Sequence, residues 1–326
     1  GRLLAREIQR DNKKFIEKKL KIKFDNWFSE ESLHEKNSVK KIFEVLKKKN
    51  LVYEKEGALW LKTKEFGDNE DRVIVRSSKE PTYFLPDIAY HQDKTVRGFD
   101  LLIDVWGADH HGYIGRLQAA KKMLGWKPDL KVFIAQMVSL KSKGKALKLS
   151  KRKGRIITLE WLVDKAGLDV SRFFYIMKSL DSQMEFDLDL ALEQSEKNPV
   201  FYVQYAYARI SSILRNAQDT GQNPSKINNF RDADFLLLKE SAEISLIKKI
   251  CQLSYILYIC VATLDPYMLT VYLQELAECF HKFYDQHRVL TDDSRLSRAR
   301  LGLLIAVRSV FALGLDLLGI CKPEKM

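Results

Sequence analysis

The sequence predicts an α/β domain followed by an all-α domain, and two observations support this prediction. First, the mostly apolar runs Leu101–Trp106 and Lys131–Leu140 have the character of strands, and Gly112–Leu124 between them has the character of a helix. A strand–helix–strand order is typical of a right-handed βαβ unit in a parallel sheet. Second, nearly all of the chain from Asn198 onward has apolar residues at helical spacing.

Local patterns predict the elements that precede the βαβ unit. Residues 1–50 have a helical pattern and are rich in lysine. Leu51–Lys64 alternates around a turn at Glu56-Gly57, which predicts a β-hairpin. Val73–Arg76 reads as a further strand. The strand at Leu101–Trp106 should be buried, because parallel sheets are normally covered on both faces.

The second half of the chain carries the signals of helix ends. Thr158 is predicted to cap a helix over Leu159–Ala166, and Gly167 to end it. Ser171 is predicted to cap another helix that extends to Leu180, and Gln222–Phe230 to form a polar connector. One stripe of the last helix, at helical spacing, holds Leu301, Leu304, Arg308, Phe311, Leu315 and Leu318.

These patterns divide the chain into three parts. The α/β domain is expected over residues 1–155, with residues 1–70 as an insertion-type segment. A helical joint is expected over residues 156–195, and the all-α domain over residues 196–326. Gly1–Arg6 has neither an initiator methionine nor an apolar signal segment, so we expect the chain to start inside a longer protein.

Composition limits the partners and the compartment. The 326 residues carry a formal net charge of +12, which favours a polyanionic partner such as nucleic acid. The four cysteines form no Cys-x-x-Cys pair, so we expect reduced, buried thiols in a cytoplasmic protein and no structural zinc. No apolar run reaches the length of a membrane span, and no membrane partner is expected.

Gly107–Tyr113 places a carboxylate and two histidines at the carboxyl end of a predicted strand, where ligands of such sheets bind. One interpretation is a metal hydrolase that uses Asp109, His110 and His111. Neighbouring residues on a strand or helix do not converge on one ion, so no tightly bound metal is expected. The alternatives are a loop that binds a small substrate or a phosphate at a helix N-terminus, and a solvated turn.

Lys141–Arg155 contains eight basic residues and no acidic one, with glycines near both ends. Such a dense cluster of like charges prefers a counter-anion or full solvation. One interpretation is a solvated loop. The other is a site where lysine ammonium groups neutralise a triphosphate during nucleotidyl transfer, which its position after a strand of the same predicted sheet favours.

Tyr83 and Asp87 lie four residues apart around the start of a helix that Pro86 suits. At this spacing the phenol and the carboxylate could face one pocket. A carboxylate beside a phenol would suit a cationic ligand such as a guanidinium, through bidentate pairing. The alternative is a helix cap next to a core tyrosine.

Several motifs together resemble those of a known family. Lys148-Leu149-Ser150-Lys151-Arg152 resembles the Lys-Met-Ser-Lys-Ser signature of class I aminoacyl-tRNA synthetases, with Leu for Met and Arg for the final Ser. Further segments resemble bacterial arginyl-tRNA synthetase over nearly the whole chain. They are Gly67–Val73, Thr82–His91, Arg97–Asp100, Gly107–Tyr113, Phe186–Leu190, Asn198–Val200, Tyr202–Ala206 and Cys321–Met326.

The resemblance implies a fold and a reaction. The fold would be the C-terminal part of a Rossmann-like nucleotide-binding domain, followed by a helical-bundle anticodon-binding domain. The reaction would attach arginine to tRNA(Arg) through arginyl-adenylate, with ATP as substrate together with Mg²⁺. The family is commonly monomeric, and a monomer is expected.

The resemblance also implies roles for individual residues. Lys151 would contact the ATP phosphates, with Lys148 and Ser150 in support. Tyr83 and Asp87 would bind the arginine substrate, and Asp109 and His110 would complete the amino-acid and adenosine pocket. The positions that would contact tRNA in the helical domain are Tyr205, Tyr284 and Met326.

The chain departs from the class I pattern in one respect. Class I enzymes carry a His-Ile-Gly-His-like motif, and none occurs in these 326 residues. Two interpretations follow. The chain is part of an arginine–tRNA ligase and does not form the adenylate alone, or it is a truncated tRNA-binding protein without catalysis.

Overall fold

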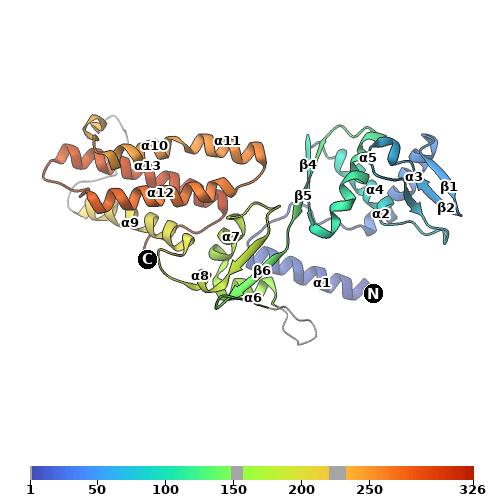
Figure 1. The fold of residues 1–326 in the computed structure, drawn as a ribbon, viewed down its shortest axis with the longest axis horizontal. Coiled ribbons are helices and arrows are strands. Elements are labelled where there is room, and N and C mark those ends of the chain that lie inside the picture. The colour runs from blue at the N-terminus through green and yellow to red at the C-terminus, as the bar shows by residue number, and fades with distance from the viewer. Residues whose placement is uncertain (1, 148–156, 220–232) are drawn as a thin grey trace. The chain divides into compact units, whose positions relative to one another are not determined.

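The computed structural model describes residues 2–147, 157–219 and 233–326 (Figure 1). The chain divides into two compact units. Residues 23–137 form what we call the α/β unit, and residues 1–22 with 138–326 form the helical unit. The predicted combination of α/β and all-α structure is confirmed, whereas the domain boundaries drawn at residues 155 and 196 stay predictions.

The α/β unit begins with two helices and a three-stranded antiparallel sheet of order β1-β2-β3. These elements are α2 (Glu31–Glu35), α3 (Ser38–Lys48), β1 (Val52–Lys55), β2 (Ala58–Leu61), the 3-10 turn η2 (Lys64–Phe66) and β3 (Arg72–Val75). The predicted hairpin is confirmed, with Glu56 and Gly57 as its turn. Their φ angles of 54° and 73° suit a two-residue turn that follows the twist of the strands.

The predicted βαβ unit is also confirmed. Strand β4 (Leu101–Gly107) pairs in parallel with β5 (Asp129–Ala135). The 3-10 turn η3 (Ala108–Tyr113) and helix α5 (Ile114–Leu124) connect the two strands. The prediction that the first strand is buried is wrong for one face, because Ile103 and Val105 are 45% and 60% exposed while alternate residues of β4 are buried.

The prediction of a single strand over Lys131–Leu140 is wrong. The segment contains the end of β5 and the start of β6 (Val138–Ser142), and the two strands belong to different sheets. Strand β6 pairs antiparallel with β7 (Lys145–Ala146) and parallel with β8 (Met184–Asp187). The lysine-rich segment therefore begins within this separate sheet, at the end of β6 and in β7, and does not follow the sheet of β4 and β5.

The helical unit contains α1 (Arg2–Lys14), the π-helical turn η1 (Phe15–Lys19), α6 (Leu159–Ala166), α7 (Leu168–Ile176) and α8 (Leu188–Leu192). The predicted cap is confirmed, since the hydroxyl of Thr158 accepts a hydrogen bond from the Trp161 amide at 3.1 Å. The prediction for Ser171 is wrong. Helix α7 begins before it, and its buried hydroxyl donates to the Gly167 carbonyl inside the helix.

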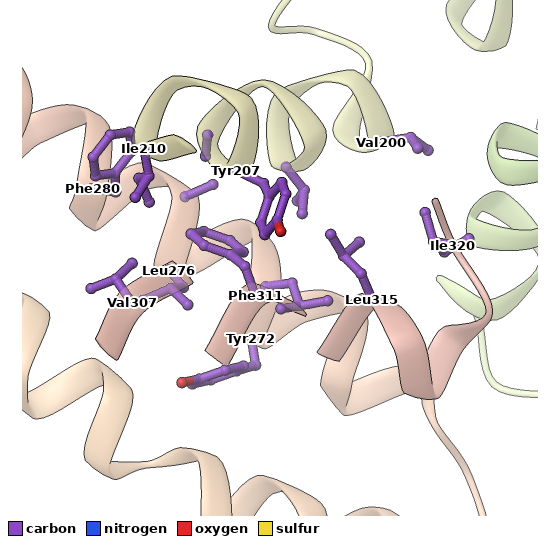
Figure 2. Close-up of a cluster of buried hydrophobic side chains, with 14 of the residues drawn as sticks. Val200, Tyr207, Ile210, Tyr272, Leu276, Phe280, Val307, Phe311, Leu315 and Ile320 are labelled. Atoms are coloured by element: carbon purple, nitrogen blue, oxygen red, sulfur yellow. The ribbon is translucent and has the colours of Figure 1, made fainter. Parts of the chain in front are cut away.

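The bundle of the helical unit consists of α9 (Pro199–Asp219), the 3-10 turn η7 (Phe235–Leu237), α10 (Ser241–Cys251), α11 (Leu253–Thr263), α12 (Tyr267–Gln286) and α13 (Ser294–Leu318). Figure 2 shows side chains of α9, α12 and α13 pointing into one apolar cluster. The apolar members of the predicted stripe on α13 are all buried, from Leu301 to Leu318. The predicted connector Gln222–Phe230 lies outside the described residues.

Two properties of this unit bear on the expectations about compartment. The cysteines are free thiols, but Cys251 and Cys321 are exposed, so the expectation of four buried thiols is wrong. Among the described residues, Ser241–Thr263 and α13 are long and apolar enough to cross a membrane by length and composition alone. Half of the apolar window of α13 is buried inside the bundle, as expected of a core helix.

Candidate functional site

The first candidate site is built around helix α4 (Phe84–Thr95) of the α/β unit. Tyr83 is the N-cap residue, and Pro86 and Asp87 lie in the first turn. Proline suits this position because the first helical amides have no intrahelical acceptor. A carboxylate suits it because the helix dipole is positive at this end. The sequence thus places Tyr83 and Asp87 one helical turn apart.

A cavity of about 500 Å³ opens beside this helix. Aromatic side chains form much of its wall, namely Tyr83, Phe84, Tyr90, Trp106 and Tyr113. Its ionisable lining groups are Asp87, His91, Lys94, Asp104 and His110. The structure therefore brings together three of the predicted residues, Tyr83, Asp87 and His110. An aromatic wall with a few charged groups is typical of a small-molecule site.

Asp87 is the distinctive group of this cavity. Its carboxylate has no hydrogen-bond or ion-pair partner among the described residues. Burial raises the pKa of Asp87, and the positive charges of His91 and His110 oppose this increase. A partly buried carboxylate without a partner is costly unless a cation joins it. The cavity is thus suited to a cationic ligand.

His91 also belongs to a buried network of charged side chains. The Nε2 atom of His91 lies 2.7 Å from Oδ2 of Asp104, and Lys94 donates from Nζ to Oδ1 of Asp104 at 2.6 Å. The ring of His91 stacks on Trp126 with 5.8 Å between centroids. Burial works to raise the pKa of Asp104, but the hydrogen bonds from His91 and Lys94 outweigh it and lower that pKa.

The predicted residues of the Gly107–Tyr113 segment have different surroundings. His110 lines the cavity, and its ring lies 6.0 Å from that of Tyr113. Asp109 is not among the lining residues. Its side chain is 81% exposed and lies 3.6 Å from His110 Nε2. No group of three or more His, Cys, Asp or Glu side chains that could hold a metal ion occurs in the part of the chain that the structure describes.

The predicted phosphate-binding residues Lys148, Ser150 and Lys151 lie outside the described residues. The described base of their segment is held by acidic groups. Lys141 lies 3.4 Å from Glu185 and 3.6 Å from Asp187. The hydrogen bond to Glu185 and these charges raise the pKa of Lys141. This lysine therefore already has counter-anions within the chain.

The second candidate site is a cavity of about 620 Å³ between α9 and α12 of the helical unit. Tyr205 and Tyr284, both predicted to contact tRNA, line it together with Arg209 and His281. The guanidinium of Arg209 lies 4.7 Å from the Tyr284 ring centroid and 5.8 Å from that of Tyr205. Aromatic faces next to an arginine form a stacking platform for an unpaired base.

Contacting aromatic rings line this cavity. The ring of His281 stacks on Tyr205 at 5.7 Å and lies 4.7 Å from the ring of Tyr202. Burial lowers the pKa of His281, which favours the neutral ring. Three acidic residues, Glu196, Glu278 and Asp285, also line the cavity and could accept hydrogen bonds from amino groups of a base.

The predicted contact Met326 is the last residue of the chain and is 53% exposed. Glu324 anchors the tail just before it. Arg308 donates to one carboxylate oxygen of Glu324 at 2.5 Å, and Arg215 donates to the other at 3.1 Å. Arg215 also donates to the Glu324 main-chain carbonyl at 2.9 Å. The tail is thus fixed on the bundle, whereas the side chain of Met326 does not line the second cavity.

Reasoning from the sequence missed His91, Lys94 and Asp104. A signal for the first two was present, because His91 and Lys94 follow Asp87 by four and seven residues and share its face of a helix. Asp104 had no such signal, since it lies in a mostly apolar strand. Reasoning from the sequence also missed His281 and Arg209. Tertiary packing brings these two residues to the predicted tyrosines.

Two family models match successive parts of the chain. Residues 2–187 match the family described as tRNA synthetases class I (R), catalytic domain. Residues 203–326 match the DALR anticodon binding domain. The first match contains the residues that line the cavity at Asp87. The second contains Tyr205 and Tyr284, whereas Glu196, Phe201 and Tyr202 of the same cavity precede it.

Individual relatives and solved structures add detail. The arginine–tRNA ligase of Caldanaerobacter subterraneus subsp. tengcongensis is 47% identical over 307 residues, which are 94% of this chain and 54% of that protein. The arginine–tRNA ligase of Carboxydothermus hydrogenoformans is 43% identical over 327 residues, covering 100% of this chain and 58% of that protein. A crystal structure of an arginyl-tRNA synthetase from Campylobacter jejuni superposes with a TM-score of 0.85 at 33% identity, covering 94% of this chain and 66% of that one. The chain thus spans about half the length of the curated relatives it matches.

Proposed function

Because this chain belongs to the class I tRNA synthetase (R) family, we propose that it is part of an arginine–tRNA ligase. The cavity at Asp87 binds the arginine substrate, and the helical bundle binds tRNA(Arg). In the first step, a carboxylate oxygen of arginine attacks the α-phosphate of ATP, with Mg²⁺ as countercharge, and pyrophosphate leaves. In the second, the ribose at the 3′ end of tRNA attacks the arginyl carbonyl, and AMP leaves.

The roles of this chain in that reaction are binding and orientation. Asp87 and Tyr83 hold the guanidinium end of arginine, with His110 at the cavity wall and Asp109 nearby. Lys151, supported by Lys148 and Ser150, neutralises charge on the ATP phosphates. No side-chain nucleophile is needed, because holding the reactants in line and stabilising charge account for most of the effect.

The observation that carries the proposal is the unpartnered carboxylate of Asp87 in an aromatic cavity. A guanidinium would supply the missing charge and donate two parallel hydrogen bonds to the two carboxylate oxygens. A neutral ligand of the same shape would leave the carboxylate buried without compensation. The site should therefore distinguish a guanidinium from a neutral ureido group of nearly equal size.

Calorimetric titration of the purified chain with arginine and with citrulline tests the proposal. The two amino acids differ in the charge of the side-chain end group. We expect arginine to bind at least about 30-fold more tightly, the lower bound for a desolvated charge pair. Equal affinity for the two ligands, or no binding of arginine, would contradict the proposal. Arginine binding would also disfavour the alternative of a tRNA-binding protein without catalysis, which needs no such cavity.

The 326-residue chain alone should not form arginyl-adenylate. The reason is that it contains no His-Ile-Gly-His-like motif, which class I enzymes carry. The measurement is tRNA-dependent exchange of labelled pyrophosphate into ATP. The arginyl-tRNA synthetase of Campylobacter jejuni serves as the positive control. Sustained exchange by the purified chain would show that this prediction is wrong.

The two tyrosines of the second cavity should contribute to tRNA binding. We expect Tyr205→Ala and Tyr284→Ala each to weaken binding of tRNA(Arg) by about 1–3 kcal/mol, the usual contribution of one base stacked on an aromatic ring. Phenylalanine at either position should retain most of the affinity, because it keeps the aromatic face. Fluorescence anisotropy of labelled tRNA at fixed salt concentration measures the effect.

A matched control is available within the same bundle. Tyr255 lies on α11, is 65% exposed and does not line the cavity. Tyr255→Ala should leave the affinity for tRNA(Arg) unchanged. If this variant lost as much affinity as the other two, the cavity between α9 and α12 would not be the site of stacking.

A further inference from the structure

The distances around His91 show where protons must lie in its network with Asp104. The Nδ1 atom of His91 lies 2.8 Å from the main-chain carbonyl oxygen of Asp87. A carbonyl oxygen only accepts hydrogen bonds, so Nδ1 carries a proton. The Nε2 atom lies 2.7 Å from Oδ2 of Asp104, which requires a second proton between these two atoms. That proton belongs either to an imidazolium or to a carboxyl group.

The net charge of the network does not depend on the location of the shared proton. If His91 holds the proton, the network consists of an imidazolium, a carboxylate and the ammonium of Lys94. If Asp104 holds it, two groups are neutral and the ammonium remains. His91, Asp104 and Lys94 therefore carry one net positive charge in both cases. Lys94 donates to Oδ1 of Asp104 at 2.6 Å, and its Nζ also lies 3.3 Å from Nε2 of His91, so the three groups form one cluster.

This charge lines the same cavity as the candidate ligand-binding carboxylate. The side chains of His91 and Asp104 are 5% and 6% exposed, and that of Lys94 is 16% exposed. His91 is held by the carbonyl of Asp87 itself, one helical turn away. Water and salt screen such an interaction less than one on an exposed surface, because the three side chains are largely buried. The structure thus places a net positive charge one helical turn from a carboxylate whose pKa burial raises.

We propose that His91 is a positioning residue for Asp87, and that its network with Asp104 and Lys94 keeps Asp87 ionised for a cationic ligand. This inference rests on the proposed function in identifying the ligand as arginine. The network does not touch the reacting atoms. It acts through Asp87, because a neutral carboxyl group could not pair with a guanidinium. The network also fixes α4 against β4, which orients the first turn of the helix.

Other ionisable groups act on Asp87 from the elements around it. Glu30, which precedes α2, and Asp104 on β4 favour the neutral carboxyl. His110 on η3 and His91 on α4 favour the carboxylate. A positive charge on His110 therefore also acts on the ionisation of Asp87. The experiment must distinguish its effect from that of the buried network.

The test is to titrate the Asp87 carboxyl carbon by NMR in the aspartate-labelled chain, with Asp87→Asn to assign the signal. His91→Gln removes the ring charge, and Lys94→Gln removes the same charge without changing the ring. We expect both variants to raise the titration midpoint of Asp87, by up to about one pH unit, because an opposite charge nearby favours the carboxylate. His110→Gln measures the contribution of the exposed histidine. Lys121→Gln, which removes a lysine paired with Asp129 on another part of the unit, should change nothing.

Arginine affinity as a function of pH gives a second readout. Binding needs the carboxylate, so affinity should rise with pH through the Asp87 midpoint, and this rise should move to higher pH in His91→Gln and Lys94→Gln. A residue with a merely structural role would lower the affinity at every pH without moving the midpoint. An unchanged midpoint of Asp87 in Lys94→Gln, in which His91 still pairs with Asp104, would overturn the inference. Absence of arginine binding in the unaltered chain would instead contradict the proposed function, while the NMR titration would still decide the role of His91.

Discussion

Replacing Asp87 by asparagine should reduce the affinity for arginine by about 2–5 kcal/mol, which is roughly 30-fold to several thousand-fold. Asparagine has nearly the same shape but no charge, so it removes the ion pair and one of the two acceptors that a guanidinium would use. The affinity for citrulline should change little, and the discrimination between the two ligands should disappear. Calorimetric titration with both ligands measures this change.

The stability of the same variant separates a binding role from a structural one. Burial raises the pKa of Asp87, so the ionised carboxylate is less favourable in the folded chain than in the unfolded chain. At a pH above that raised pKa, the charged carboxylate lowers the free energy of unfolding. At a pH below the pKa of Asp87 in the unfolded chain, the carboxyl is neutral in both states and this destabilisation is absent. Asp87→Asn should therefore leave the midpoint of thermal unfolding at neutral pH unchanged or raise it. A variant that lost arginine binding only because it unfolds would show a lower midpoint of thermal unfolding.

Asp93→Asn is the matched control for that experiment. Asp93 lies on the same helix, forms an ion pair with Arg97 and does not line the cavity. We expect the arginine affinity of this variant to remain close to that of the unaltered chain. A comparable loss of affinity would mean that negative charge anywhere on α4, and not the carboxylate inside the cavity, attracts the ligand.

Local signals made much of the fold predictable. The hairpin at Glu56-Gly57 and the cap at Thr158 depend on residues that are close in sequence, and both are confirmed. The strand–helix–strand unit was also predictable, because its apolar runs and the helix between them follow directly in the chain. Ser171 misled the prediction because serine also occurs inside helices, where its hydroxyl bonds to the preceding turn.

The break inside Lys131–Leu140 could not be seen in the sequence. An apolar run shows strand character but does not show which partner each residue pairs with. Here β5 pairs with β4, whereas β6 pairs with β8, whose residues lie about 45 positions further along the chain. The break between them is set by those two partners. The exposure of one face of β4 could not be predicted from the sequence either. The rule that parallel strands are buried assumes that other elements pack on both faces of the sheet.

The candidate site was predictable where its residues share one helix. Tyr83 and Asp87 were found from their spacing and from their chemistry. The network behind them depends on a contact between α4 and β4, and Asp104 differs from its apolar neighbours in the strand only by its charge. A buried carboxylate in such a strand is costly without a partner. An acidic residue in an apolar run is therefore a usable signal for a buried charge network.

A second large effect is expected in the helical unit, where Arg300 on α13 and Glu243 on α10 form a buried ion pair. Arg300 donates from Nε to Glu243 Oε1 at 2.7 Å and from Nη1 to the carbonyl of Arg288 at 2.7 Å. The other oxygen of Glu243 accepts from the amide of Glu240 at 2.9 Å. The side chains of Glu243 and Arg300 are 0% and 7% exposed. Both carboxylate oxygens of Glu243, and Nε and Nη1 of Arg300, thus have partners.

Arg300→Met should lower the free energy of unfolding by about 3–5 kcal/mol, because it leaves the carboxylate of Glu243 buried without compensation. The double variant Arg300→Met with Glu243→Leu should recover part of this loss, since an apolar pair of similar volume has no buried charge. Urea denaturation followed by far-ultraviolet circular dichroism measures both values.

Arg295→Met is the control on the same helix. Its partner Asp234 lies 2.6 Å away, but the arginine side chain is 71% exposed, so the loss should be at most about 1 kcal/mol. If Arg295→Met destabilised the chain as strongly as Arg300→Met, burial would not be the source of the effect.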